Sequence, residues 1–177
     1  GIEQRGEYLP FGEQMGLYEE VYFSSEQALS QKNAQITLSF RMNFLRIPSE
    51  TYGQDRKRDW KLIMKRTDFI PDPEYDIGID EVIWEYYNGN DWRKLPESDR
   101  YSKVFDQLER KTEITFNCPG DLTPVLVGAV EGRYIRARIL KMNNLYRWNG
   151  QYITPVLRDT GFEYRYHEPL PMPELIE

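Results

Sequence analysis

The feature that most constrains the fold is the strict alternation of residues 35–44, which read QITLSFRMNF. Thr, Ser, Arg and Asn separate the apolar side chains of Ile36, Leu38, Phe40, Met42 and Phe44. Successive side chains of a β-strand point to opposite faces, so this pattern predicts a strand with one buried and one solvated face. Half-buried strands of this kind are typical of antiparallel sheets.

Further short strands are predicted along the chain, separated by turn signals rich in Gly, Asn, Asp and Pro. The expected strands are 60–64, 81–87, 113–118, 133–140 and 162–166, and the expected turns are 88–91, 119–121, 130–132 and 143–145. Helix signals are few. Ser24 and Gln27 have the spacing of a capping box before a short helical turn, and residues 104–108 suit a second one. The pattern predicts an all-β fold: an antiparallel β-sandwich, jelly-roll-like, with one or two short helical turns.

The domain organisation follows from the length of 177 residues, which suits one sizeable domain. We expect a single β-sandwich domain over residues 1–167, with an aromatic-rich N-terminal segment, 1–34, packing on it. Residues 168–177, EPLPMPELIE, are Pro-rich, which is typical of an extended linker to another domain.

The composition argues against several classes of protein. A net charge of −6 is opposite to the basic footprint that nucleic-acid and anionic-membrane binding need. No run of 18 apolar residues predicts a membrane span, and the start, GIEQRGEYLP, lacks the apolar core of a signal peptide. The single cysteine, Cys118, allows no internal disulfide and fits a reducing compartment. A single histidine, His167, removes most zinc sites and makes acid–base chemistry at neutral pH harder to build.

The stretch WEYYNGNDWRKL, residues 84–95, predicts a β-hairpin that turns at 88–89 or at 89–90. Either register gives the same two faces. The face expected to be buried carries Val82, Trp84, Tyr86, Arg93 and Leu95. The face expected to be wet carries Ile83, Glu85, Tyr87, Trp92 and Lys94.

We expect specific contacts within this hairpin. Trp84 should lie in the core, Arg93 across an aromatic ring, and Glu85 should pair with Lys94. Trp92 should stay partly exposed near the turn. Cross-strand aromatic packing is the simpler interpretation of the rings, and contact of Trp92 and Tyr87 with a ligand or partner is the alternative.

Residue patterns for chemistry are weak. The acidic stretch 72–81, DPEYDIGIDE, fails as an EF-hand because Ile77 and Ile83 stand where Gly and Glu are needed. It leaves open a calcium site of another kind at Asp72, Asp76 and Asp80, against the simpler interpretation of a solvated acidic loop. Cys118 continues an apolar alternation, which predicts a buried small side chain and not a nucleophile paired with His167. We therefore expect that the chain is not an enzyme, that it has no catalytic residues, and that it binds no cofactor other than calcium.

Three blocks of the sequence resemble blocks of large baseplate proteins of phage-tail-like contractile injection systems. They are YLPFGEQMGLYEEVYFSSEQALSQKNAQITLSF at 8–40, the hairpin WEYYNGNDWRKL at 84–95, and VEGRYIRARI at 130–139. The matching positions of the first block are Pro10, Phe11, Gly12, Glu13, Tyr18, Tyr22, Ser25, Ser30 and Ala34. Asn33 stands where that family usually has Gly, and Ala28-Leu29 where it has Ala/Val-Phe.

The resemblance implies one β-domain of a much larger structural protein, with a non-catalytic role in assembly through contacts with other baseplate or tail proteins. It also implies assembly in the cytoplasm, followed by incorporation into a tail-like particle. The alternative is a carbohydrate-binding module on a jelly roll, with a glycan as partner. A sugar binder needs a flat pair of exposed rings, whereas an assembly domain needs an exposed apolar patch.

Overall fold

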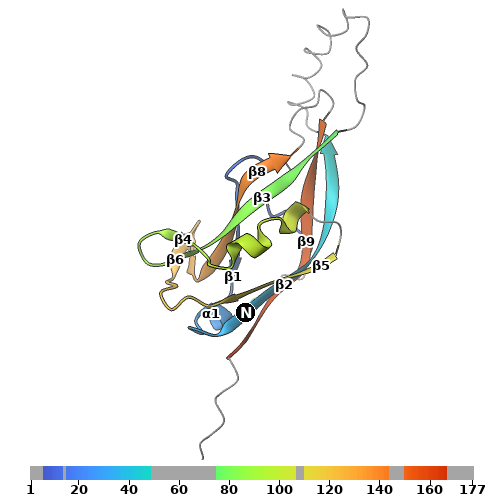
Figure 1. Cartoon of the computed structure of the whole chain (residues 1–177). Coiled ribbons are helices and arrows are strands. Elements are labelled where there is room, and N and C mark those ends of the chain that lie inside the picture. The colour runs from blue at the N-terminus through green and yellow to red at the C-terminus, as the bar shows by residue number, and fades with distance from the viewer. Residues whose placement is uncertain (1–5, 14, 49–74, 107–109, 144–149, 167–177) are drawn as a thin grey trace, which may run out of the picture.

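The computed structural model describes residues 6–13, 15–48, 75–106, 110–143 and 150–166, and it is an all-β fold with a few short helices (Figure 1). In chain order the elements are β1 (Glu20–Ser24), α1 (Glu26–Leu29), β2 (Gln35–Pro48), β3 (Tyr75–Tyr87), β4 (Trp92–Lys94), η1 (Ser98–Tyr101), η2 (Val104–Asp106), β5 (Arg110–Asn117), β6 (Val125–Val127), β7 (Val130–Gly132), β8 (Tyr134–Asn143) and β9 (Gly150–Arg165).

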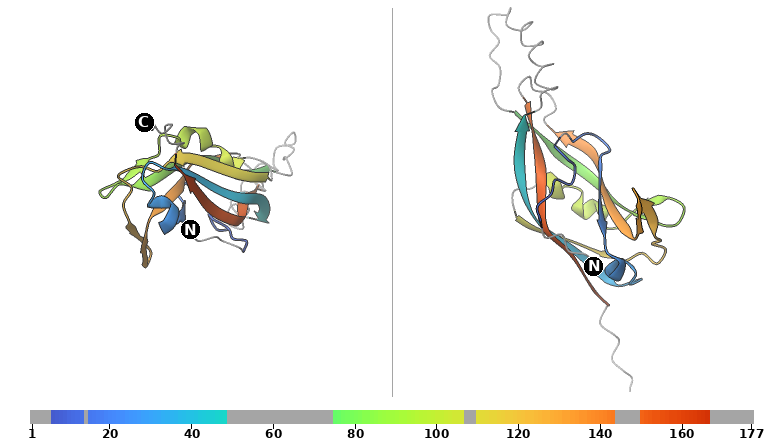
Figure 2. Two further views of the ribbon diagram at one scale, coloured as in Figure 1. Left: turned by 90° about the horizontal axis from the view of Figure 1, so that it is seen from below. Right: turned by 180° about the vertical axis from the view of Figure 1, so that it is seen from behind.

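Seven strands form one continuous sheet in the order β1-β8-β3-β9-β2-β5, with β4 added to β3. The pairings are antiparallel except at one junction, where residues 75–77 of β3 run parallel to residues 150–152 of β9. From this junction two arms diverge and face each other, as Figure 2 shows. Arm one is β1, β8, β3 and β4, and arm two is β9, β2 and β5. The predicted sandwich of mainly antiparallel strands is confirmed, with its two layers joined along one edge.

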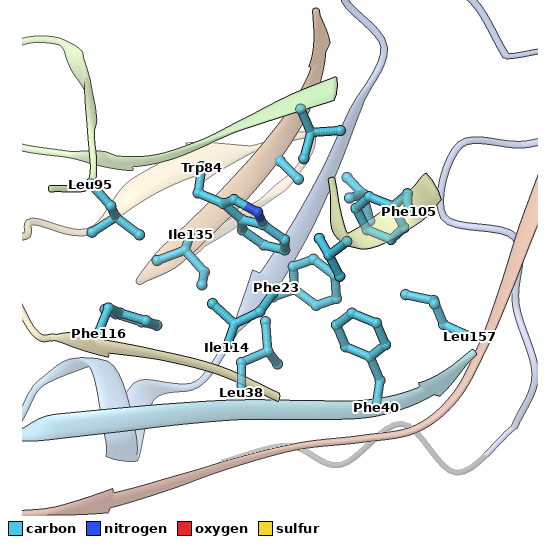
Figure 3. Packing of buried hydrophobic residues seen from close by; sticks show 14 of the residues in the cluster. Phe23, Leu38, Phe40, Trp84, Leu95, Phe105, Ile114, Phe116, Ile135 and Leu157 are labelled. Atoms are coloured by element: carbon cyan, nitrogen blue, oxygen red, sulfur yellow. The ribbon is translucent and has the colours of Figure 1, made fainter. Parts of the chain in front are cut away.

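The core lies between the arms, where aromatic rings from both layers meet (Figure 3). Phe23 of β1 stacks on Phe40 of β2 with ring centroids 5.9 Å apart, and lies 5.7 Å from Trp84 of β3. Phe105 of η2 closes the group, 6.2 Å from Trp84. The alternation of β2 is confirmed, because its apolar positions through Met42 are fully buried. Burying each large side chain contributes about 1.5–3 kcal/mol.

The described part of the N-terminal segment packs on this sandwich. Phe11 is buried with its ring edge 5.2 Å from Phe105. Tyr8 and Leu157 exchange two backbone hydrogen bonds of 2.9 Å, which attach the segment to β9. Tyr22 does not pack into the core as Phe11 does. Its ring lies 5.7 Å from Trp92, on the outer side of arm one.

Several local predictions need correction. The N-cap of α1 is Ser25 and not Ser24, since Ser25 Oγ accepts the hydrogen bond of the Ala28 amide at 3.0 Å. Residues 130–132 form strand β7, and the turn before it contains Gly128 at a φ of 60°. β9 begins well before the predicted residue 162. The helical turn expected over 104–108 is found as η2, whereas η1 was not expected. The predicted strand 60–64 and the stretch 168–177 lie outside the described residues.

Candidate functional site

The outer face of arm one carries a cluster of aromatic and charged side chains that we call the outer platform. Strand alternation produces it: the side chains next to buried Trp84 and Ala137 point the opposite way, to the outside. The strand register then brings Tyr22, Arg136 and Glu85 into one row across β1, β8 and β3. The outer platform consists of Glu20, Tyr22, Glu85, Tyr87, Trp92, Arg136 and Arg138.

Glu85 lies at the centre of the outer platform and is only 5% exposed. Its Oε1 accepts a hydrogen bond from Arg136 Nε at 2.8 Å, and its Oε2 accepts one from Arg138 Nη2 at 3.1 Å. The hydrogen bond to Glu85 raises the pKa of the Arg138 guanidinium. Guanidinium groups can saturate both oxygens of a desolvated carboxylate, which a lysine ammonium does less well. The expected pair of Glu85 with Lys94 is therefore wrong, and Lys94 contacts Asp99 at 2.8 Å.

Arg136 joins the ionic and aromatic parts of the outer platform. Its Nη1 lies 3.0 Å from Glu20 Oε2, and its Cζ lies 4.1 Å from the centre of the Trp92 ring, a cation–π geometry. Tyr22 donates its hydroxyl proton to Glu20 at 2.6 Å, and burial with this bond raises the Tyr22 pKa. The arginine expected to lie across a ring was Arg93, but its exposed side chain lies 3.5 Å from Asp91.

The two contact residues predicted from the sequence are brought together. Tyr87 and Trp92 are directly opposite across β3 and β4, with ring centroids 5.6 Å apart and planes at 60°. The predicted burial of the hairpin is confirmed for Trp84 and Leu95. It is wrong for Glu85, which is buried on the face expected to be wet, and for Arg93, which is exposed. Gly89, with a φ of 103°, makes the turn.

The described residues include only part of the predicted calcium candidates, and of Cys118 and His167 only Cys118. Asp80 is 3.1 Å from Lys103 Nζ, while Asp72 and the side chain of Asp76 lie outside the described residues. Within the ranges that the structure describes, no three His, Cys, Asp or Glu side chains gather as metal ligands. Cys118 is buried, and desolvation raises the pKa of its thiol to about 11, so it stays protonated at neutral pH. His167 is outside the described residues.

A half-enclosed groove of about 220 Å³ lies between β1 and β9, beside the outer platform. Its lining residues are Tyr8, Tyr22, Phe23, Ser24, Tyr134, Thr160 and Phe162. Each tyrosine hydroxyl in it is bonded within the chain. Tyr8 contacts Thr160 at 3.3 Å, Tyr22 donates to Glu20, and Tyr134 donates to the Val130 carbonyl at 3.0 Å. The groove therefore offers mainly carbon surfaces to an occupant.

Sequence reasoning missed the buried Glu85 and its two arginines. A signal was present, because Glu85, Arg136 and Arg138 all fall on outward positions of their strands. The alternation alone predicts a solvated face. Only the pairing of β3 with β8 shows that Glu85 forms ion pairs with the two arginines and is buried beneath them.

Comparisons of this chain with family models, with curated proteins and with solved structures gave no match. In the described ranges, the helices are too short and too polar to span a bilayer.

Proposed function

We propose that this chain is a non-catalytic docking domain of a phage-tail-like baseplate protein, acting through protein–protein contacts. The observation that carries the proposal is the outer platform. Buried Glu85 holds Arg136 and Arg138 in fixed positions, and Arg136 lies over the Trp92 ring. Trp, Tyr and Arg side chains dominate the binding energy of protein interfaces, and side chains already held in place lose less entropy on binding.

The assignment to a baseplate rests on the resemblance, and the fold supports it in one respect. The resembling blocks are distant in sequence, yet they supply neighbouring strands of arm one: β1, the hairpin of β3 and β4, and most of β8. The first block also includes the start of β2 in arm two. The departure at Asn33 is also compatible, because its φ of 67° is a conformation that Gly and Asn both accept.

The test uses the full-length protein within the particle. Trp92→Ala and Arg138→Ala remove hot-spot side chains without opening the core, and we expect about tenfold less chain incorporated into tail-like particles. Lys111→Ala, an exposed residue on β5 of arm two, is the matched control. Incorporation is measured by quantitative gel analysis of purified particles, and baseplate completeness by electron microscopy. Normal particles from both platform variants, or no such particle containing this chain, would overturn the proposal.

A second candidate, a carbohydrate-binding module, is favoured by the partly exposed Trp92 beside Tyr87 and Tyr22. Against it, the Trp92 plane is tilted by 60° and 64° to those rings, so the three form no flat surface for a sugar. Acrylamide quenching of tryptophan fluorescence with a glycan panel, repeated on Trp92→Phe, separates the two functions. Protection by a glycan that disappears in Trp92→Phe would assign a sugar site, and no response would leave protein docking.

A further inference from the structure

The hairpin formed by β6 and β7, residues 125–132, projects from the body of the molecule, and we call it the finger (Figure 2). Its six residues from Val125 to Val130, VLVGAV, are all apolar or glycine. Leu126 is 65% exposed and Val130 63%, the highest values among the large apolar side chains that the structure describes. An apolar run of this length outside the core is costly in water unless another surface covers it.

The base of the finger is fixed to the domain by several bonds. Tyr134 Oη donates to the Val130 carbonyl at 3.0 Å, and the Thr123 amide donates to the Tyr87 carbonyl at 2.9 Å. The Arg133 amide bonds to the Glu26 carboxylate, and Arg133 Nη1 reaches the same group at 2.8 Å. The exposed position of Leu126 and Val130 is therefore imposed by the fold, although a hairpin of two strands is barely stable alone.

A surface that suits the finger is present on the same molecule. The groove between β1 and β9 has aromatic walls, and its polar groups are already bonded. Its volume of about 220 Å³ is below the ~300–1,000 Å³ of ordinary small-molecule pockets. It therefore suits one or two aliphatic side chains from a protein, such as Leu126.

We propose that two copies of this chain associate, with the finger of each copy seated in the groove of the other. Tyr134 lines the groove and also bonds to Val130 in the finger, so the two surfaces are neighbours on one side of the molecule. A two-fold axis near Tyr134 places each finger opposite the other groove, which is the self-complementary arrangement of symmetric dimers.

The chemistry of the finger favours a protein as its occupant. A segment that binds membranes carries basic and aromatic residues, whereas the finger has neither and holds the acidic residue Glu131. The inference goes beyond the docking function, because it concerns a second copy and not the other proteins of a baseplate.

The first test is the oligomeric state of the full chain, measured by sedimentation velocity over a wide concentration range. We expect a monomer–dimer equilibrium, at least tenfold weaker in Leu126→Asp, because burying the carboxylate in an aromatic groove is unfavourable. Leu45→Asp is the matched control, since Leu45 is an exposed leucine on β2, away from both surfaces. A wild-type chain that stays monomeric, or a dimer that Leu126→Asp leaves unchanged, overturns the proposal.

A second test reports the geometry. Leu126→Cys chains are mixed with Ser24→Cys chains under mild oxidation, and we expect a disulfide between the two kinds of chain. Native Cys118 is buried and does not compete. Asp99→Cys, an exposed position on η1, replaces Ser24→Cys in the control mixture. Equal cross-linking in both mixtures would also overturn the proposal. If the chain is monomeric but Leu126 is protected in assembled particles, the finger belongs to a contact with another protein.

Discussion

At the scale of single residues, Glu85 determines the geometry of the outer platform. It binds Arg138 through two hydrogen bonds, of 3.3 and 3.1 Å, and Arg136 through one. Glu85→Gln keeps the shape but leaves a buried positive charge with less compensation, so we expect unfolding in urea to become about 3 kcal/mol easier. Lys94→Ala, which breaks the exposed pair with Asp99, should cost less than about 1 kcal/mol. If Glu85→Gln lowered the free energy of unfolding by as little as Lys94→Ala does, the Glu85 network would not stabilise the fold.

Cys118 gives a prediction about pH at the same scale. Burial raises the pKa of its thiol from 9.0 to about 11, so the folded state holds this proton more tightly than the unfolded chain. The resulting stabilisation is complete below about pH 9 and is lost as the pH rises through about 11. We expect the free energy of unfolding of the wild type, minus that of Cys118→Ala, to fall in this window by up to about 1.4 kcal/mol per pH unit. Urea denaturation of both proteins across the window measures this difference. The tyrosines titrate in both proteins, so their contribution cancels. A constant difference would contradict the prediction.

At the scale of elements, β5 is an edge strand of arm two whose open side is covered by side chains. The Thr115 amide donates to Tyr101 Oη at 3.2 Å, and the Asn117 amide donates to Glu97 Oε2 at 3.1 Å. Since an uncovered strand edge is a template for aggregation, we expect Glu97→Ala with Tyr101→Phe to speed hydrogen exchange at these two amides and to lower solubility on heating. Each lost bond should cost about 1 kcal/mol. Arg100→Ala, between the two positions, is the control, and unchanged exchange in the double variant would contradict this role.

How far sequence predicts the elements depends on whether local pattern or distant pairing decides them. The alternation of β2 predicted its strand and its buried side chains, because one buried face imposes period two. β9 was predicted only at its end. Its earlier part contains Pro155, Asp159 and Gly161, residue types typical of turns, and Asp159 adopts a φ of 56° at an irregularity within the strand. Long-range pairing with β2 overrides those local preferences, and a single sequence does not show that pairing.

The candidate site follows the same rule. The register of the hairpin was predicted correctly, since the turn signal fixes the pairing of Tyr87 with Trp92. The partner of Glu85 was not, because Arg136 reaches it through the pairing of β8 with β3 and not through the hairpin. Local sequence thus predicted which side chains face outward, while the ion pairs among them depend on the order of strands in the sheet.

At the scale of the whole molecule, the two arms share one core and one junction, so they should unfold together. Phe23 of arm one stacks on Phe40 of arm two, and Trp84 of arm one packs against Phe23. If one arm unfolds, the apolar face of the other arm becomes exposed to water. We expect one transition in urea. The fluorescence of Trp84 and Trp92 of arm one, measured with Trp60 and Trp148 replaced by Phe, should coincide with the far-ultraviolet circular dichroism of the whole sheet. Separate midpoints would show that the arms are independent units.

The N-terminal segment belongs to this cooperative unit, because Phe11 is buried against Phe105 and Tyr8 is hydrogen-bonded to β9. Phe11→Ala should therefore lower the free energy of unfolding by about 3 kcal/mol, through lost burial and the cavity left behind. It should do so without splitting the transition. Leu17→Ala, which truncates an exposed side chain in the same segment, should change stability by less than about 0.5 kcal/mol. If Phe11→Ala melts like the wild type, the segment does not close the core; if it produces two transitions, the segment docks on a body that is already folded.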